Sequence, residues 1–110
     1  MSHRIPAGEP AAGPSGSGTV VLELGPGAGA LVLYTPAARV GAEIEISLAD
    51  VAARRTHSMV RPRHVAGTTV YAAVYPDLPP GDYTIWAGSA TVATVAVAAG
   101  AVTRATWPGA

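Results

Sequence analysis

Short apolar runs and turn-forming residues alternate along the chain from residue 19 to its end. The clearest run is Glu43–Leu48 (EIEISL), in which Ile44, Ile46 and Leu48 alternate with polar residues. This period of two predicts a strand with one buried face and one face toward water. Similar runs rich in apolar and β-branched residues predict further strands at residues 19–24, 30–35, 56–61, 68–75, 83–87, 91–98 and 102–107. Seven or eight short strands without a convincing helix predict an all-β fold, a single antiparallel sandwich.

Turn signals between these runs predict which strands pair. The glycine-rich residues 25–29 predict a hairpin between the first two runs. Residues 62–67 (PRHVAG) connect 56–61 to 68–75, which predicts a second pair. The prolines of residues 76–82 (PDLPPGD) make a rigid link to the next strand.

The beginning of the chain differs from the rest in composition. Residues 1–18 are rich in Gly, Pro and Ser and contain almost nothing to bury. Such a segment cannot offset the entropy lost on ordering. We therefore predict a disordered tail at residues 1–18 and a β-sandwich domain at residues 19–110.

Composition limits the classes of function. A chain of 110 residues has room for one domain, and its Ala- and Val-rich apolar set without Phe fits a sheet. Seven Arg balance seven Asp and Glu, and this neutrality argues against nucleic acid or an acidic membrane as the main partner. No run approaches the ~20 apolar residues of a membrane span, and no secretion signal is visible, so we expect a cytoplasmic protein. Without cysteine the chain has neither disulfides nor thiolate sites.

One segment of the second half resembles a known family. Residues 78–86 read Leu-Pro-Pro-Gly-Asp-Tyr-Thr-Ile-Trp, which is similar to the "L-P-x-G-x-Y" hairpin of prealbumin-like domains, the carboxypeptidase regulatory-like and Cna-B-type sandwiches. The resemblance covers residues 68–107 and implies a tight turn at Gly81 and an inward-packed ring at Tyr83. It also implies an accessory, adhesive or structural module. Isopeptide cross-links are excluded because the chain lacks Lys and Asn.

The first half is similar to short actinobacterial proteins of unknown function. The chain lacks Lys, Asn, Gln and Cys, a bias typical of a GC-rich genome. Arginine is therefore frequent for reasons unrelated to guanidinium chemistry, and its abundance alone indicates no site.

No catalytic constellation is visible in the sequence. Asp50, His57 and Ser58 are residue types of a hydrolytic triad, but neighbouring residues of a strand point to opposite faces. His57 and Ser58 would therefore be separated. We expect no enzymatic activity.

A histidine-based metal site is the second chemical possibility. His57 and His64 are seven residues apart in the sequence and could converge across a turn, with Glu43 or Glu45 as a third ligand. The alternative is a pair of surface histidines beside arginines, whose charge repels a cation. We favour the alternative and expect no metal or other cofactor.

The most distinctive polar feature is a cluster of arginine and histidine. Its members are Arg54, Arg55, His57, Arg61, Arg63 and His64. Guanidinium groups bind carboxylate or phosphate through paired hydrogen bonds, and His57, Met59 and Arg61 would share one strand face. In the alternative interpretation the arginines pair with Glu43, Glu45 and Asp50 of a neighbouring strand and support the sheet.

Two tyrosines leave a choice between surface and core. Tyr71 and Tyr75 share a strand face, opposite a face that carries Val70 and Val74. If the valine face is buried, the tyrosines form an exposed aromatic stripe suited to binding. If the sheet is covered on both sides, both belong to the core.

These observations predict a non-enzymatic binding or interaction module. It would recognise a small anionic ligand or an acidic partner protein through the Arg/His segment, with Tyr71 and Tyr75 as further candidates. The alternatives are a structural or accessory domain without a ligand and a His-based metal-binding protein. Homo-oligomerisation by edge-strand pairing is also open, because short Val/Ala strands leave an edge available.

Overall fold

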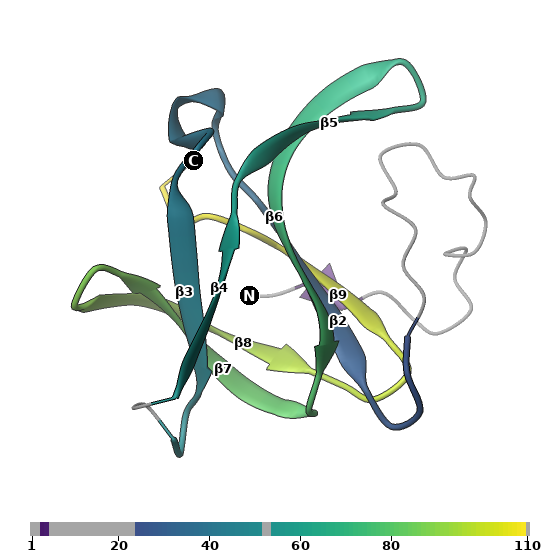
Figure 1. Ribbon diagram of the computed structural model, residues 1–110, viewed down its shortest axis with the longest axis vertical. Coiled ribbons are helices and arrows are strands. Elements are labelled where there is room, and N and C mark those ends of the chain that lie inside the picture. The colour runs from purple at the N-terminus through teal and green to yellow at the C-terminus, as the bar shows by residue number, and fades with distance from the viewer. Residues whose placement is uncertain (1–2, 5–23, 52–53, 110) are drawn as a thin grey trace.

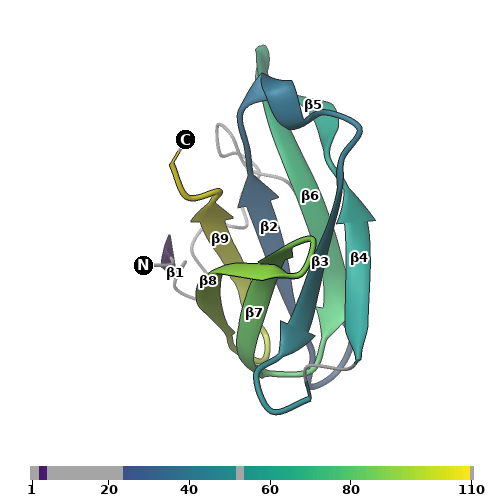
Figure 2. The ribbon, with the colours of Figure 1, turned by 90° about the vertical axis from the view of Figure 1, so that its left-hand side faces the viewer.

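A computed structural model describes residues 3–4, 24–51 and 54–109, which form two β-sheets packed face to face (Figures 1 and 2). The strands are β1 (His3–Arg4), β2 (Gly29–Tyr34), β3 (Glu43–Leu48), β4 (Arg55–Met59), β5 (Arg61–Val65), β6 (Thr68–Leu78), β7 (Gly81–Ala87), β8 (Ala90–Val97) and β9 (Val102–Thr106). A single turn of 3-10 helix, η2 (Ala37–Arg39), lies between β2 and β3. The prediction of an all-β sandwich is confirmed.

Each sheet combines strands that are distant in the sequence. Sheet A has the order β1-β9-β2-β6-β5, and sheet B has the order β4-β3-β7-β8. Most neighbours are antiparallel, as predicted. The exception is β2, which runs parallel to β9. The predicted hairpin of residues 19–24 with 30–35 involves residues outside the described ranges, and β2 itself pairs with β6 and β9.

The core lies between the two sheets and is built from alternating strand residues. Leu31 and Leu33 of β2 face Ile44 and Ile46 of β3, and all four are almost fully buried. The alternation of β3 therefore buries the isoleucines as predicted. Ser47 departs from the pattern, because it points away from the core and is nevertheless only 1 % exposed.

The chain changes sheets at Val60. β4 pairs with β3 in sheet B, whereas β5 pairs with β6 in sheet A. Figure 1 shows the ribbon continuing from one strand into the other. Val60 is buried at this crossing, and its backbone N–H donates to the Ala42 carbonyl at 2.9 Å. The prediction of one strand at 56–61 paired with 68–75 is therefore wrong, and most of the supposed connection at 62–67 belongs to β5.

The proline-rich link leads to the next strand, as predicted, but it crosses from one sheet to the other. β6 extends to Leu78 in sheet A, and β7 begins at Gly81 in sheet B. The resemblance implied a hairpin here, but the segment connects the two sheets instead. Gly81 has a φ of +149°, and Tyr83 packs inward with 3 % exposure.

The remaining prediction concerns the start of the chain. Of the predicted tail, the structure describes His3–Arg4, whose backbone pairs with Thr103 and Arg104 of β9. The rest of residues 1–18 lies outside the described residues.

Candidate functional site

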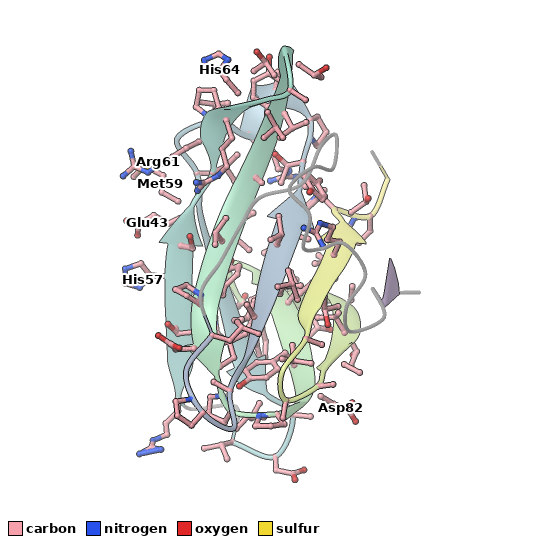
Figure 3. All side chains as sticks on the ribbon, turned by 90° about the vertical axis from the view of Figure 1, so that its right-hand side faces the viewer. Glu43, His57, Met59, Arg61, His64 and Asp82 are labelled. Carbon is pink, nitrogen blue, oxygen red and sulfur yellow. The ribbon has the colours of Figure 1, made fainter. Side chains whose placement is uncertain are left out.

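The Arg/His segment lies along one long side of the sandwich and not in a compact cluster. β4 is the edge of sheet B and β5 the edge of sheet A, so the segment follows two successive sheet edges. About ten extended residues separate Arg54 from His64, a span of ~33 Å. Figure 3 shows His57, Met59 and Arg61 projecting from the same side with Glu43 among them, and His64 at one end of the molecule.

Arg55 is held by contacts on the outer face of sheet B. Its Nη1 donates to Glu45 Oε1 at 2.8 Å and to the Gly88 carbonyl at 2.9 Å. Its guanidinium also lies over the Trp86 ring, 3.7 Å from the centroid, while Trp86 Nε1 donates to Ser47 Oγ at 2.9 Å. The indole of Trp86 therefore covers Ser47 and explains why Ser47 is buried on the outer face of the sheet. Arg55 connects β4 to the β7–β8 turn and has a structural role.

Replacing Arg55 by alanine is expected to lower the free energy of unfolding by about 1 kcal/mol, from the lost stacking and the lost hydrogen bond to Gly88. The ion pair adds little to this value, because the two side chains are 28 % and 45 % exposed. Urea denaturation measures the loss, and the emission of Trp86 should shift to longer wavelength as its ring becomes hydrated. Arg55→Lys is the control: it keeps the charge but not the planar fork, and it should lose about half as much. Equal stability of all three proteins would contradict this role.

Arg61 and Arg63 lie on the same face of β5, two residues apart. Arg63 Nε donates to the Ala72 carbonyl at 3.2 Å. Burial lowers the pKa of the Arg63 guanidinium, and the nearby charge of Arg61 lowers it further. Arg61 is exposed. Two positive charges therefore stand side by side on this edge.

The predicted pairing of the arginines with neighbouring carboxylates holds for one of them. Among the described residues, the ion pair is that of Arg55 with Glu45. Neither Arg54, Arg61 nor Arg63 makes such a contact with a described carboxylate. The interpretation of the whole cluster as internally paired therefore fails for three of its four arginines.

The two histidines of the segment are far apart. His57 is opposite Glu45 in the β3–β4 pair, whereas His64 lies near the end of β5, with Nδ1 3.0 Å from Thr69 Oγ1. Seven residues of extended chain separate them by ~23 Å. The convergence on a metal considered above therefore does not occur. In the described part of the chain, no three His, Asp or Glu side chains come close enough to hold a metal ion.

The two tyrosines belong to the interior of the sandwich. Tyr75 is 2 % exposed, and its hydroxyl donates to the Ile44 carbonyl of the opposite sheet at 2.7 Å. Tyr71 is half-buried and packs against the same core. The exposed aromatic stripe is thus excluded for Tyr75, which cannot be a surface ligand-binding residue. Burial raises the pKa of the Tyr75 hydroxyl.

Arg54 belongs to a separate feature, a cavity of about 300 Å³ at one end of the sandwich. Apolar side chains such as Leu48, Leu78 and Tyr83 line it together with Arg54 and Asp77. Asp77 has a φ of +56°, and its Oδ1 accepts a hydrogen bond from Gly25 N–H at 3.1 Å. Sequence reasoning missed Asp77, although an aspartate after Pro76 is a turn signal.

No protein-family model matches this sequence, and searches of curated proteins and of solved structures likewise found no match. Within the residues that the structure describes, no helix has the length and apolar character to cross a membrane. The function must therefore be argued from the residues themselves.

Proposed function

We propose that the chain is a non-enzymatic protein-interaction module that binds an acidic segment of a partner along the β4–β5 edge. The observation that carries the proposal is the position of Arg61 and Arg63, adjacent on one face and without an ion pair to any described carboxylate. Two guanidinium groups at this spacing can each bind a carboxylate of an extended acidic peptide. Like charges side by side are unfavourable until such a partner neutralises them.

An acidic protein fits this surface better than a small anion. The described part of the structure has cavities at the ends of the sandwich and one beside β8, and neither Arg61 nor Arg63 lines any of these. The edge instead offers a strip of the exposed His57 and Arg61 with the half-buried Met59 between them. A small ligand needs a concave site that surrounds it, whereas a strip suits an extended partner.

The second candidate function is a structural or accessory domain without its own ligand. The contacts of Arg55 with Trp86 and Glu45 favour it, as does the hydrogen bond of Arg63 to the Ala72 carbonyl. Under this hypothesis Arg61 is a solubilising residue that protects the sheet edge. The two functions differ in whether Arg61 is needed for binding.

We also propose that the sandwich is prealbumin-like. The support for this assignment is the sequence resemblance around Leu78, Gly81 and Tyr83. The inward packing of Tyr83, whose hydroxyl donates to the Pro79 carbonyl at 2.6 Å, agrees with what the resemblance implies for this residue.

The test of the interaction function uses a fluorescein-labelled octaglutamate peptide and measures its anisotropy at low and physiological salt. Arg61→Ala is expected to weaken binding roughly tenfold at low salt, as for a lost hydrogen bond between charged groups, and to reduce the salt dependence. Arg54→Ala is the matched control, because it removes the same charge beyond the other end of β4 and should change the affinity by less than about twofold.

Three outcomes would contradict the proposal. An equal loss in both variants would indicate unspecific attraction to positive charge. Absence of peptide binding would favour the accessory domain. Displacement of the peptide by inorganic phosphate at a similar concentration would indicate a small-anion site.

A further inference from the structure

The edge of sheet B opposite β4 is formed by β8, an unusually unprotected strand. β7 pairs with one side of β8, and no described strand pairs with the other. Its sequence, ATVATVAV, contains no charged residue and no proline. Unpaired N–H and C=O groups along such an edge are a template for a further strand, and proteins normally protect them with charges or proline.

The other edges carry that protection. β5 contains Arg61, Pro62 and Arg63, and β4 contains Arg55 and His57. At the far side of sheet A, the two-residue β1 covers part of β9. Among the described strands, β8 is therefore the edge on which another strand can add.

The structure indicates where along β8 this addition is possible. The Ala96 carbonyl accepts a hydrogen bond from Thr103 Oγ1 of β9 at 3.2 Å, so this carbonyl points away from β7 and toward the open edge. In an antiparallel pair, the backbone groups of alternate residues point to the same side. Thr94 therefore presents its N–H and C=O on the side of the Ala96 carbonyl, away from β7. The Thr94 side chain is exposed.

A cavity of mixed lining lies beside this position, with apolar side chains together with Thr94 and Thr106. It has a volume of about 190 Å³ and separates β8 from the end of β9. Ala93 and Val95 line it from β8, and Ala105 and Pro108 line it from the opposite side. A strand added at Thr94 would gain apolar contacts here as well as backbone hydrogen bonds.

We propose that β8 pairs antiparallel with β8 of a second copy of this chain, about a two-fold axis at Thr94. The strand is uncharged, so it has no electrostatic barrier to meeting itself, and the whole chain has a formal net charge of zero. The β4–β5 edge, with its repelling arginines, is unsuited to the same contact. The two sheets B would join into one continuous sheet.

This pairing is independent of the proposed acidic-partner site. β4 and β8 are opposite edges of sheet B, and Figure 2 shows them on opposite sides of the molecule. A dimer formed through β8 leaves both β4–β5 edges open. It would present two basic edges to one partner and raise the avidity without any new contact.

The test is the mass of the full chain in solution, measured by sedimentation equilibrium over a range of concentrations. The wild-type protein is expected to reach twice the 11.0 kDa of one chain. Thr94→Lys should give the monomer mass, because the two-fold axis places the introduced charges opposite each other. Thr84→Lys is the control: Thr84 is opposite Thr94 in the inner strand β7, so this variant should remain dimeric.

Thr94→Pro gives a second variant, which removes the N–H without adding charge and should also be monomeric. Circular dichroism confirms that each variant is folded. A wild-type monomer at all concentrations would overturn the proposal, as would a folded Thr94→Lys dimer. A monomer whose Thr94 amide is protected from hydrogen exchange would mean that the same chain covers the edge, which also contradicts the second copy. Loss of the dimer in Arg61→Ala would place the dimer contact at the β4–β5 edge and so contradict pairing through β8.

Discussion

Substitution of Gly29 by alanine is expected to destabilise the protein by about 3 kcal/mol, the upper range for overpacking a buried site. A Cβ atom at Gly29 would lie 2.3 Å from the Ala98 carbonyl oxygen and 2.7 Å from Val97 Cγ1. The first of these atoms belongs to the backbone, so it cannot move by rotating a side chain. Relief requires that the end of β8 separate from the start of β2, where the two sheets meet.

Gly25→Ala provides the matched control for this substitution. Its Cβ would lie 3.2 Å from Asp77 Oδ1, which is the mobile end of a side chain. The expected cost is less than about 1 kcal/mol. Urea denaturation of both variants gives the comparison through the shift of the midpoint. If Gly29→Ala costs no more than Gly25→Ala, the close approach of β2 and β8 described here is incorrect.

Local alternation predicted the strands whose two faces differ. Glu43–Leu48 forms β3 over the predicted residues, because its isoleucines face the core and its glutamates face outward. Ser47 is the residue of this strand that the pattern could not place. Its burial depends on Trp86, which lies on a neighbouring strand and is distant in the sequence.

The division of residues 56–61 could not be predicted from periodicity. No Gly, Pro, Asn or Asp interrupts residues 56–61 (THSMVR), so a single strand explains the sequence as well as two. The crossing depends on hydrogen bonds of Val60 with Gly41 and Ala42, which only the folded chain brings together. The parallel pairing of β2 with β9 could not be predicted for the same reason, because strands that are distant in the sequence carry no local signal of their pairing.

The candidate site shows the same limit. His57, Met59 and Arg61 project from the same side, as predicted, but His57 and Met59 lie on β4 and Arg61 on β5, whereas the prediction assumed one strand. The structural role that separates Arg55 from the other arginines was not predicted, because it depends on Trp86 and on the Gly88 carbonyl, which are distant in the sequence. The four arginines are close in the sequence but have different places in the fold. Arg55 makes a structural contact, Arg61 and Arg63 lie on the basic edge, and Arg54 lines a cavity. The charges are evident from the sequence, and their partners are not.

Tyr75→Phe is expected to cost about 2 kcal/mol at neutral pH, because it removes a buried hydrogen bond and leaves the Ile44 carbonyl without its inter-sheet donor. Tyr83→Phe is the control, since its bond to the Pro79 carbonyl is local and only partly buried, and it should cost less than about 1 kcal/mol. Guanidinium denaturation at neutral pH compares the two variants. Equal losses of stability would mean that the inter-sheet hydrogen bond of Tyr75 contributes no more than the local hydrogen bond of Tyr83.

The same hydroxyl predicts how stability depends on pH. Burial raises the pKa of Tyr75 above its ordinary value of 10.0, so in alkali the unfolded chain loses this proton before the folded protein does. Its contribution is therefore complete below about pH 10 and declines above it, by up to about 1.4 kcal/mol per pH unit. Tyr75→Phe lacks this decline, so its deficit relative to the wild type should shrink as the pH rises from 10 to 11. Denaturation curves of both proteins across this range measure the difference. A constant deficit would show that Tyr75 ionises as easily in the folded protein as in the unfolded chain, which is incompatible with its place between the sheets.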